Sequence, residues 1–378
     1  MAVDMIDRFN PKLAKYISAL TAAEELCLSG EPPQIKDPKT GESYPPTSAR
    51  CHDRFKVVIP FAGQTLRWEV IFSDVDMPPD LSFGSHDAGF VPDITSLQFL
   101  NSWDLDDPNS LVSLLQELIG QYKQYQADLV AKIPRLQFDC DFLTSSEEYS
   151  DFEILSFRGN QSYENIVNIF IRIPVDLDSI PPYLIAENPG KDIACLLISY
   201  QSPEGSVQVT PKLFLSPRLE RAFGRSSSLH IPPWGGQNGS CLMDYVPAVH
   251  QMLTQKVKAV SSGYRLRKDY VSAFLSLFGG SVLEYDAGKF HSLSLLFKVQ
   301  GFCCILKIHL SVGFPLDKPS FTLHSIYHES NGIPYHEEHK NYSYSPRWSP
   351  SEMAEAARSY LLQAVPEFKE SSLSNGTF

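Results

Sequence analysis

A hairpin followed by a proline-rich turn occurs near both ends of this chain, and this repeated order of segments limits the folds that the chain can adopt. Residues 54–61 (RFKVVIPF) and 66–72 (LRWEVIF) are β-rich runs joined by a turn that contains Gly63, which predicts a β-hairpin. Residues 77–83 follow, with a proline pair that opens another short strand. The C-terminal copy comprises residues 292–299, 302–310 and 314–323. The repeat predicts two β-meanders with the same plan.

The middle of the chain contains a looser copy of this pattern. Three apolar, β-rich runs lie at 166–173, 193–199 and 207–215. The first strands of the three copies begin near residues 55, 166 and 293, at intervals of somewhat more than a hundred residues. Since 378 residues are too many for one ordinary compact domain, we expect several. The predicted domains are 1–140, 141–260 and 261–378.

Helices are predicted beside the meanders. Asp107 and Pro108 have the residue types of an N-cap and a first helical position. Residues 349–352 (SPSE) have the pattern of a capping box, and Pro366 is expected to end the helix that it begins. Residues 245–278 predict two helices with a break at 261–263. The helical residues expected to be mostly buried are Leu111, Leu115, Leu118, Tyr360 and Leu361. Helices on one face of antiparallel sheets define an α+β fold.

Composition excludes several classes of partner. The chain has 32 Lys and Arg against 44 Asp and Glu, a net charge of −12, and no basic block, which argues against direct binding of nucleic acid or an anionic membrane. No apolar run approaches the length of a membrane span, and the N-terminus lacks a signal-peptide pattern. The 7 cysteines are scattered and never form CxxC, which is typical of reduced thiols in the cytosol or nucleus.

The order of segments resembles the fold of ubiquitin-conjugating enzymes and their inactive variants. Residues 314–319 (FPLDKP) through 326–328 (IYH) resemble the stretch of these enzymes that runs from a Tyr-Pro to a Tyr-His-Pro-Asn. Residues 345–350 (SPRWSP) resemble the Trp-Ser-Pro before their later helix. Residues 78–80 (PPD) and 102–103 (SW) take the corresponding places in the N-terminal copy. The resemblance implies tandem variant-like domains, each a meander with flanking helices.

Four further runs narrow the resemblance to the BRE family over essentially the whole chain. They are 53–56 (DRFK), 229–232 (LHIP), 244–247 (DYVP) and 344–348 (YSPRW). Members of this family are scaffold subunits of the BRISC deubiquitinase assembly and of its nuclear DNA-damage-response counterpart. The resemblance implies three protein partners: a zinc metalloprotease deubiquitinase, its inactive metalloprotease-like companion and a von Willebrand-type adaptor. It also implies a cytoplasmic and nuclear location.

A conjugating enzyme needs a cysteine nucleophile in the loop after its fourth strand. That loop should lie within 84–106 in the first copy and within 328–348 in the third, and neither segment contains cysteine. After His328 the expected Pro-Asn is replaced by Glu329-Ser330, so the oxyanion-stabilising side chain is missing too. Cys51 precedes the first hairpin, and Cys303 and Cys304 lie in a predicted strand. The chain is therefore predicted not to be an enzyme.

No metal or cofactor site is predicted. His324, His328, His336 and His339 are close in sequence, but they lack the HExxH pattern and a supporting cysteine, and a solvated loop is the simpler interpretation. The Gly-rich segment 233–240 lacks the Lys-Ser/Thr of a phosphate-binding loop. Residues whose types suit a partner interface are Tyr344, Pro346, Arg347, Trp348 and Trp234.

Three functions remain open at this stage. The first is a non-catalytic scaffold that joins deubiquitinase subunits and helps to recruit polyubiquitinated substrates. The second is a free-standing receptor that binds ubiquitin without a covalent bond. The third, an active conjugating enzyme with a displaced cysteine, is disfavoured by the two loops without cysteine.

Overall fold

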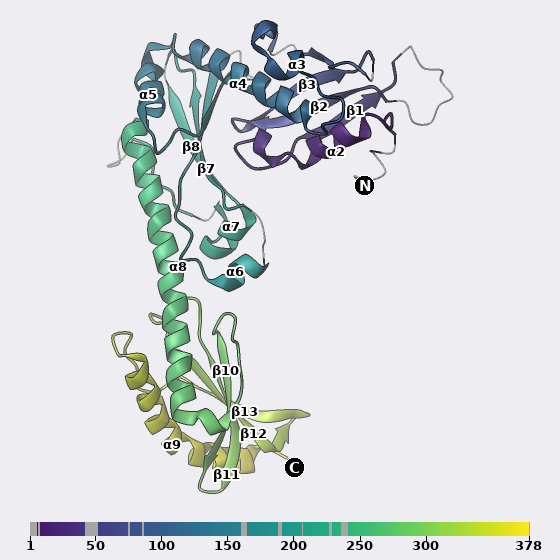
Figure 1. Ribbon diagram of the computed structural model, residues 1–378. Coiled ribbons are helices and arrows are strands. Elements are labelled where there is room, and N and C mark those ends of the chain that lie inside the picture. Colours follow the sequence, from purple (N-terminus) through teal and green to yellow (C-terminus); the bar gives the residue numbers. More distant parts are fainter. Residues whose placement is uncertain are drawn as a thin grey trace. The chain divides into compact units, whose positions relative to one another are not determined.

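The computed structural model describes residues 6, 8–41, 52–74, 76–84, 87–159, 165–187, 191–205, 207–226, 229–235 and 241–377. These residues form three antiparallel sheets with flanking helices (Figure 1). The chain divides into two compact units. The first comprises Met1–Val175 and Gly190–Leu253, and the second comprises Asp176–Pro189 and Thr254–Phe378. The predicted α+β class is confirmed.

The first sheet contains the N-terminal hairpin that the sequence predicts. Its strands, in spatial order, are β1 (Gln34–Lys39), β2 (Arg54–Phe61), β3 (Gln64–Ile71) and β4 (Asp80–Ser82). The turn between β2 and β3 has φ of 45° at Ala62 and 73° at Gly63, the positive values that a two-residue hairpin turn requires. A Cβ atom on Gly63 would lie 2.8 Å from a methyl group of Leu197, so glycine is needed there for two reasons.

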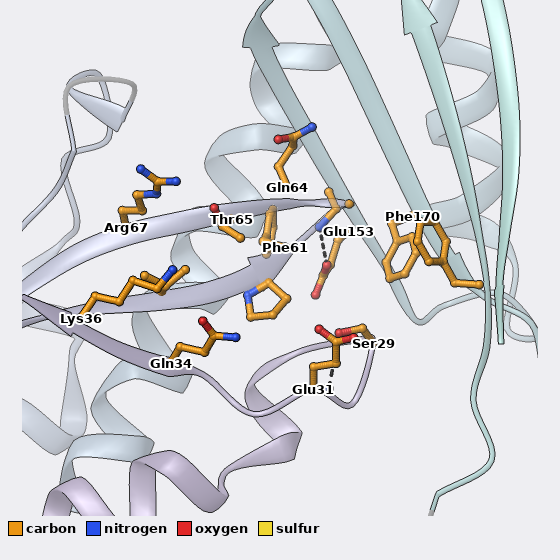
Figure 2. A pocket seen from close by; sticks show the side chains of 15 residues that line it. Ser29, Glu31, Gln34, Lys36, Phe61, Gln64, Thr65, Arg67, Glu153 and Phe170 are labelled. Atoms are coloured by element: carbon orange, nitrogen blue, oxygen red, sulfur yellow. Dashed lines mark hydrogen bonds between the residues drawn. The ribbon is translucent and has the colours of Figure 1, made fainter. Parts of the chain in front are cut away.

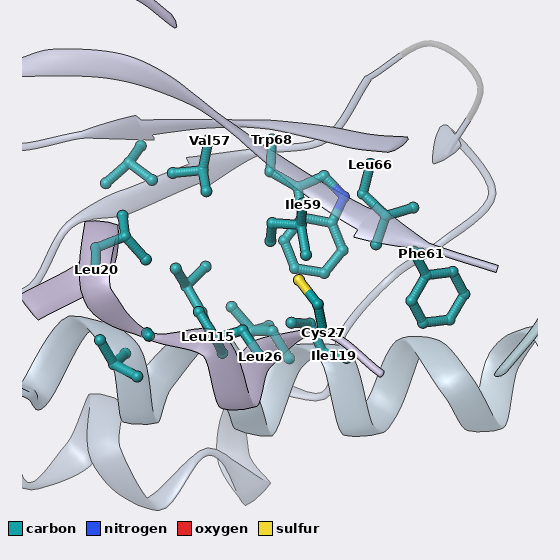
Figure 3. Packing of buried hydrophobic residues seen from close by; sticks show 14 of the residues in the cluster. Leu20, Leu26, Cys27, Val57, Ile59, Phe61, Leu66, Trp68, Leu115 and Ile119 are labelled. Carbon is teal, nitrogen blue, oxygen red and sulfur yellow. The ribbon is translucent and has the colours of Figure 1, made fainter. Parts of the chain in front are cut away.

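The core of this part lies between the sheet and the helices α2 (Ala14–Ala22) and α4 (Ser110–Val130). Figure 3 shows side chains of β2 and β3 pointing toward α4, with Leu26 and Cys27 between them. Trp68 is fully buried, and its ring lies 5.2 Å from that of Phe83 and 5.7 Å from that of Tyr122. The predicted burial of α4 is confirmed, because Leu111, Leu115 and Leu118 are at most 1% exposed.

Before α4 the chain forms η1 (Glu24–Leu26), η3 (Ile94–Ser96) and α3 (Gln98–Asn101). The predicted start of α4 was too early. Asp107 accepts a hydrogen bond from the backbone N–H of Asn109, at 2.9 Å, so it caps a turn just before a helix that begins at Ser110.

The middle sheet contains β5 (Phe152–Arg158), β6 (Asn165–Arg172), β7 (Ala194–Gln201) and β8 (Gln208–Leu215), in that spatial order. The sequence predicts β6, β7 and β8 but not β5. Consecutive residues of β6 and β7 are buried, which means that both faces of the sheet are covered. Phe170 and Leu197 belong to the same apolar cluster as the core of the first sheet. Helix α5 (Pro134–Ser145) precedes β5, and helix α7 (Pro217–Phe223) follows β8.

A buried carboxylate joins the first and middle sheets. Glu153 on β5 is 1% exposed, and its two oxygens accept hydrogen bonds from the backbone N–H of Ala62 at 2.8 Å and of Leu28 at 3.2 Å. Asn168 on β6 donates a hydrogen bond to the carbonyl oxygen of Ala62 at 2.9 Å. Both polar groups of the Ala62 backbone are therefore satisfied by side chains of the middle sheet.

The second unit contains a five-stranded sheet. Its strands, in spatial order, are β13 (Ile333–His339), β12 (Ser320–Ser330), β11 (Phe302–His309), β10 (Ser292–Val299) and β9 (Val282–Tyr285). Helices α6 (Pro182–Glu187) and α9 (Pro350–Asn375), the turn η5 (Gly279–Ser281) and the later part of α8 (Leu242–Phe278) belong to the same unit. The hairpin predicted at 292–310 is confirmed.

Two further predicted helix boundaries were wrong. Helix α8 continues through residues 261–263 (Figure 1), because Ser and Gly cost only about 0.5–1 kcal/mol each in a helix and buried residues lie on either side. Helix α9 continues past Pro366 to Asn375. The carbonyl that Pro366 leaves without a helical donor belongs to Leu362, whose side chain is 48% exposed, and burial of Phe368 stabilises the continuation.

The capping box that begins α9 is confirmed. The Ser349 hydroxyl accepts a hydrogen bond from the Glu352 backbone N–H, and the Glu352 carboxylate accepts one from the Ser349 backbone N–H at 2.7 Å. The hydrogen bonds that the Glu352 carboxylate accepts from the backbone N–H and the hydroxyl of Ser349 lower the pKa of Glu352. Leu361 is fully buried as predicted, whereas Tyr360 is only half-buried.

The Glu153→Ala substitution is expected to lower the free energy of unfolding by about 2–4 kcal/mol, because two buried backbone N–H groups lose their acceptor. Glu147→Ala is the matched control, since Glu147 is exposed and lies in the segment before β5. Urea unfolding of both variants measures the difference. Equal stability of the two variants would contradict a structural role for Glu153.

The same residue predicts a pH dependence. Burial raises the pKa of Glu153 above its ordinary value of 4.5, so the folded protein holds this proton more tightly than the unfolded chain. The stability that comes from this protonation is complete below pH 4.5 and is lost as the pH rises through the folded-state pKa. The free energy of unfolding of the wild type should therefore fall relative to that of Glu153→Gln above this pH. A pH-independent difference would contradict the raised pKa.

Candidate partner-binding surfaces

The segments that correspond to the catalytic loop of a conjugating enzyme have different structures in the two copies. In the first copy the described part of 84–106 holds η3 and α3. In the third copy the expectation of a loop directly after His328 was wrong. Strand β12 extends to Ser330, and β13 returns from Ile333 to His339. The dipeptide Asn331-Gly332 has φ of 55° and 75° and forms the turn, a hairpin signal that was available in the sequence.

Four of the described cysteines lack the properties of a nucleophile. Burial raises the pKa of the Cys27, Cys195 and Cys304 thiols to about 12, and that of Cys140 to about 11. A thiol with such a pKa is almost entirely protonated at neutral pH, and only the thiolate attacks. Cys304 is fully buried in β11, whereas Cys303 is partly exposed there. Cys51 lies outside the described residues.

The four histidines lie on two strands and do not form the solvated loop that was expected. His324 on β12 and His336 on β13 are cross-strand neighbours with stacked rings 5.4 Å apart. His328 is buried, and its Nδ1 lies 3.2 Å from the hydroxyl of Ser372 on α9. His339 Nδ1 lies 2.9 Å from the hydroxyl of Tyr360. Among the described residues no group of three or more His, Cys, Asp or Glu side chains could hold a metal ion.

The residues suggested for partner binding near the start of α9 differ in their surroundings. The Tyr344 hydroxyl donates a hydrogen bond to the Pro315 carbonyl at 2.6 Å, so this side chain is half-buried and holds the proline turn. Trp348 packs against the apolar core of the second unit. Pro346 and Arg347 are exposed in the turn between them. Of the four residues, only Pro346 and Arg347 therefore offer mainly free side-chain surface.

Trp234 lies among aromatic rings. Its ring is 6.0 Å from that of Tyr200 and 5.0 Å from that of Tyr245, and the side chain is partly buried. Tyr245 also donates a hydrogen bond to the Pro232 carbonyl at 2.6 Å. These contacts place Trp234 in the packing of the first unit, while residues 236–240 of the Gly-rich segment lie outside the described residues.

The first unit contains an open pocket of about 290 Å³ where the β2–β3 hairpin meets the middle sheet (Figure 2). Phe61, Phe170 and Phe214 are the aromatic residues of its apolar part. Polar side chains contributed by β1 and β3 surround them: Gln34, Lys36, Gln64, Thr65 and Arg67. Glu153 also lines the pocket, and Figure 2 shows its hydrogen bond to the backbone of the hairpin turn. The hydrogen bonds to the backbone explain why the Glu153 carboxylate is buried here, and we assign it a role in holding the two sheets together.

The sequence did not identify this pocket. Its walls come from segments far apart in the chain, namely β1, β2, β3, β5, β6 and β8. The one available signal was Glu153, a lone charged residue in the apolar run FEILSF. A charge inside such a run indicates either a solvated face or a buried carboxylate with specific donors.

Comparison with known proteins identifies the family of this chain. A family model described as brain and reproductive organ-expressed protein (BRE) matches residues 7–329. "BRISC and BRCA1-A complex member 2" of Branchiostoma floridae is 43% identical over 350 residues, which is 90% of this chain and 90% of that protein. The protein of the same name from Danio rerio is 41% identical over 381 residues, 98% of this chain and 97% of that protein. The resemblance inferred from the four sequence runs is thereby confirmed, and the chain belongs to the BRE family.

Proposed function

We propose that this protein is a non-catalytic scaffold subunit of deubiquitinase assemblies of the BRISC and BRCA1-A type. The observation that carries the proposal is the similarity to two proteins named as members of these complexes, each over at least 90% of this chain. Similarity of this extent includes both compact units and all three sheets. The proposed role in assembly therefore concerns the whole chain and not one of its units.

The fold supports a role without chemistry. We propose that 1–140, 141–260 and 261–378 are variant-like domains that keep the meander and the capped helix of conjugating enzymes. The loops of the first and third copies contain no cysteine, and the buried thiols of the described residues are protonated at neutral pH. Such domains keep surfaces for docking while lacking the nucleophile, and function then depends on those surfaces.

The proposed partners are a zinc metalloprotease deubiquitinase, its inactive metalloprotease-like companion and a von Willebrand-type adaptor, with polyubiquitinated proteins as recruited substrates. The proposed locations are the cytoplasm and the nucleus. The net charge of −12 supports protein partners over nucleic acid. No helix in the described parts of the chain has the length and apolar character needed to span a membrane.

A non-catalytic scaffold is expected to form no covalent adduct with ubiquitin. Incubation with activating enzyme, ATP and labelled ubiquitin should give no band that a reducing agent removes, for the wild type and for Cys303→Ser alike. A known conjugating enzyme is the positive control. A reducible adduct on any cysteine would overturn the proposal. Saturable binding of free ubiquitin by the isolated chain would instead favour the receptor function.

The exposed turn before α9 is a proposed docking surface in the second unit. Arg347→Ala is expected to lower the affinity for the adaptor and protease subunits by about 10- to 30-fold, the loss that is typical of an arginine at the centre of an interface. Its exposure means that the fold should keep its stability, whereas Trp348→Ala would also remove core packing.

Arg358→Ala is the matched control, because Arg358 is an exposed arginine on α9 whose ion pair with Glu355, at 3.6 Å, contributes little. Pull-down titration with co-expressed partners measures both variants. Equal affinity for Arg347→Ala and Arg358→Ala would remove this turn from the interface.

A further inference from the structure

One segment of the first unit contains acidic residues but no Lys or Arg. Between Arg67 and Lys123 the sequence contains no Lys or Arg. The same interval contains the acidic residues Glu69, Asp74, Asp76, Asp80, Asp87, Asp93, Asp104, Asp106, Asp107 and Glu117. An excess of this size concentrates much of the negative charge of the chain in β3, β4 and the segment that leads to α4.

Exposed apolar side chains lie within this acidic interval. Val91 is 84% exposed, Ile94 is 60% exposed and Phe99 is 41% exposed. We call these three residues the apolar loop surface. Phe90 and Leu97 from the same segment are at most 5% exposed and belong to the core, so the segment alternates between anchoring and exposed apolar residues. Three large apolar residues within nine positions are therefore exposed, beside two that anchor the same segment in the core.

Two side chains of α4 hold this segment in place. The Gln121 side chain accepts a hydrogen bond from the backbone N–H of Asp93 at 2.8 Å and donates one to the Asp93 carbonyl at 3.1 Å. The Glu117 carboxylate accepts hydrogen bonds from the backbone N–H groups of Gln98 and Phe99, each at 3.1 Å. Glu117 and Gln121 are four residues apart, so both lie on the same face of the helix. The backbone that carries the apolar loop surface is therefore fixed before any partner binds.

A fixed backbone matters because ordering a loop on binding costs free energy. When that order already exists in the free protein, more of the interaction energy appears as affinity. The exposed side chains of Val91 and Ile94 add little to folding, since burial in the core is what makes apolar residues stabilising. Their presentation on a fixed segment is the arrangement expected of a docking surface.

The negative charge around this segment indicates which type of partner it can bind. Hydrogen bonds from Thr95 lower the pKa of Asp93, so this carboxylate stays ionised. The donors to Glu117 are neutral N–H groups, which leave its negative charge uncompensated. No described Lys or Arg forms an ion pair with Asp93 or Glu117: Lys12 pairs with Asp76 at 2.7 Å, and Lys15 donates to the Leu105 carbonyl. A positively charged partner is complementary to this field.

We propose that the apolar loop surface docks a basic, amphipathic segment of a partner subunit. Apolar side chains of that segment would cover Val91, Ile94 and Phe99, while its Lys and Arg residues would face Asp93 and the neighbouring carboxylates. This inference rests on the proposed scaffold function and adds the chemistry of one interface in the first unit.

The test uses the complete assembly, purified after co-expression of this chain with the protease, its companion and the adaptor. Ile94 is replaced by the photo-crosslinking residue p-benzoylphenylalanine, and the crosslinked peptide is identified by mass spectrometry. The expected result is one crosslink to a partner segment with net positive charge. Absence of a crosslink in an intact assembly, or a crosslink to an acidic segment or to a second copy of this chain, would overturn the inference.

A second measurement separates docking from folding. The triple variant Val91→Ser, Ile94→Ser and Phe99→Ser should keep the wild-type stability and lose at least tenfold in affinity for the partner that is crosslinked. The wild-type affinity should also fall as salt rises, because the attraction is between exposed charges. Val312→Ser with Leu316→Ser is the matched control, since these residues are 81% and 83% exposed in the second unit.

The outcomes distinguish this inference from the proposed function. Unchanged affinity of the triple variant in an assembly that still forms would remove the apolar loop surface and leave the scaffold role intact. Failure of the wild-type chain to co-purify with any of the three subunits would contradict the scaffold role, and the inference with it.

Discussion

The first unit depends on the two hydrogen bonds that bind the Ala62 backbone to Glu153 and Asn168. Ala62 is the tip of the β2–β3 hairpin, and both side chains belong to the middle sheet. A buried carboxylate costs several kcal/mol to desolvate unless donors surround it, so it specifies one arrangement of the two sheets. The close approach of Gly63 to Leu197 is part of the same contact. The hairpin tip and the middle sheet therefore pack as one core.

The parts of the fold that could be predicted are those that local sequence signals determine. The strands at 54–61, 292–299 and 302–310 were predicted because apolar alternation and a Gly turn are local signals. Strand β5 was missed, since its charged Glu153 finds its partners only through the tertiary fold. Helix α8 was predicted as two helices because the local cost of residues 261–263 is visible in sequence, whereas the packing that offsets it is not.

The candidate surfaces show a similar division. Tyr344, Arg347 and Trp348 were chosen by residue type, and the structure separates them into one hydrogen-bonded, one exposed and one core-packed side chain. Neither the pocket at the hairpin tip nor the apolar loop surface was predicted. The loop depends on Glu117 and Gln121, which in sequence resemble any exposed pair on a helix. The sequence pattern identifies residue types, whereas the side chains that surround each residue are known only from the fold.

Native mass spectrometry of the co-expressed assembly tests whether this chain connects the other subunits. One complex should contain the protease, its companion, the adaptor and this chain. When this chain is omitted, the adaptor should separate from the protease pair. A complex of unchanged composition, apart from the missing mass of this chain, would contradict the scaffold role.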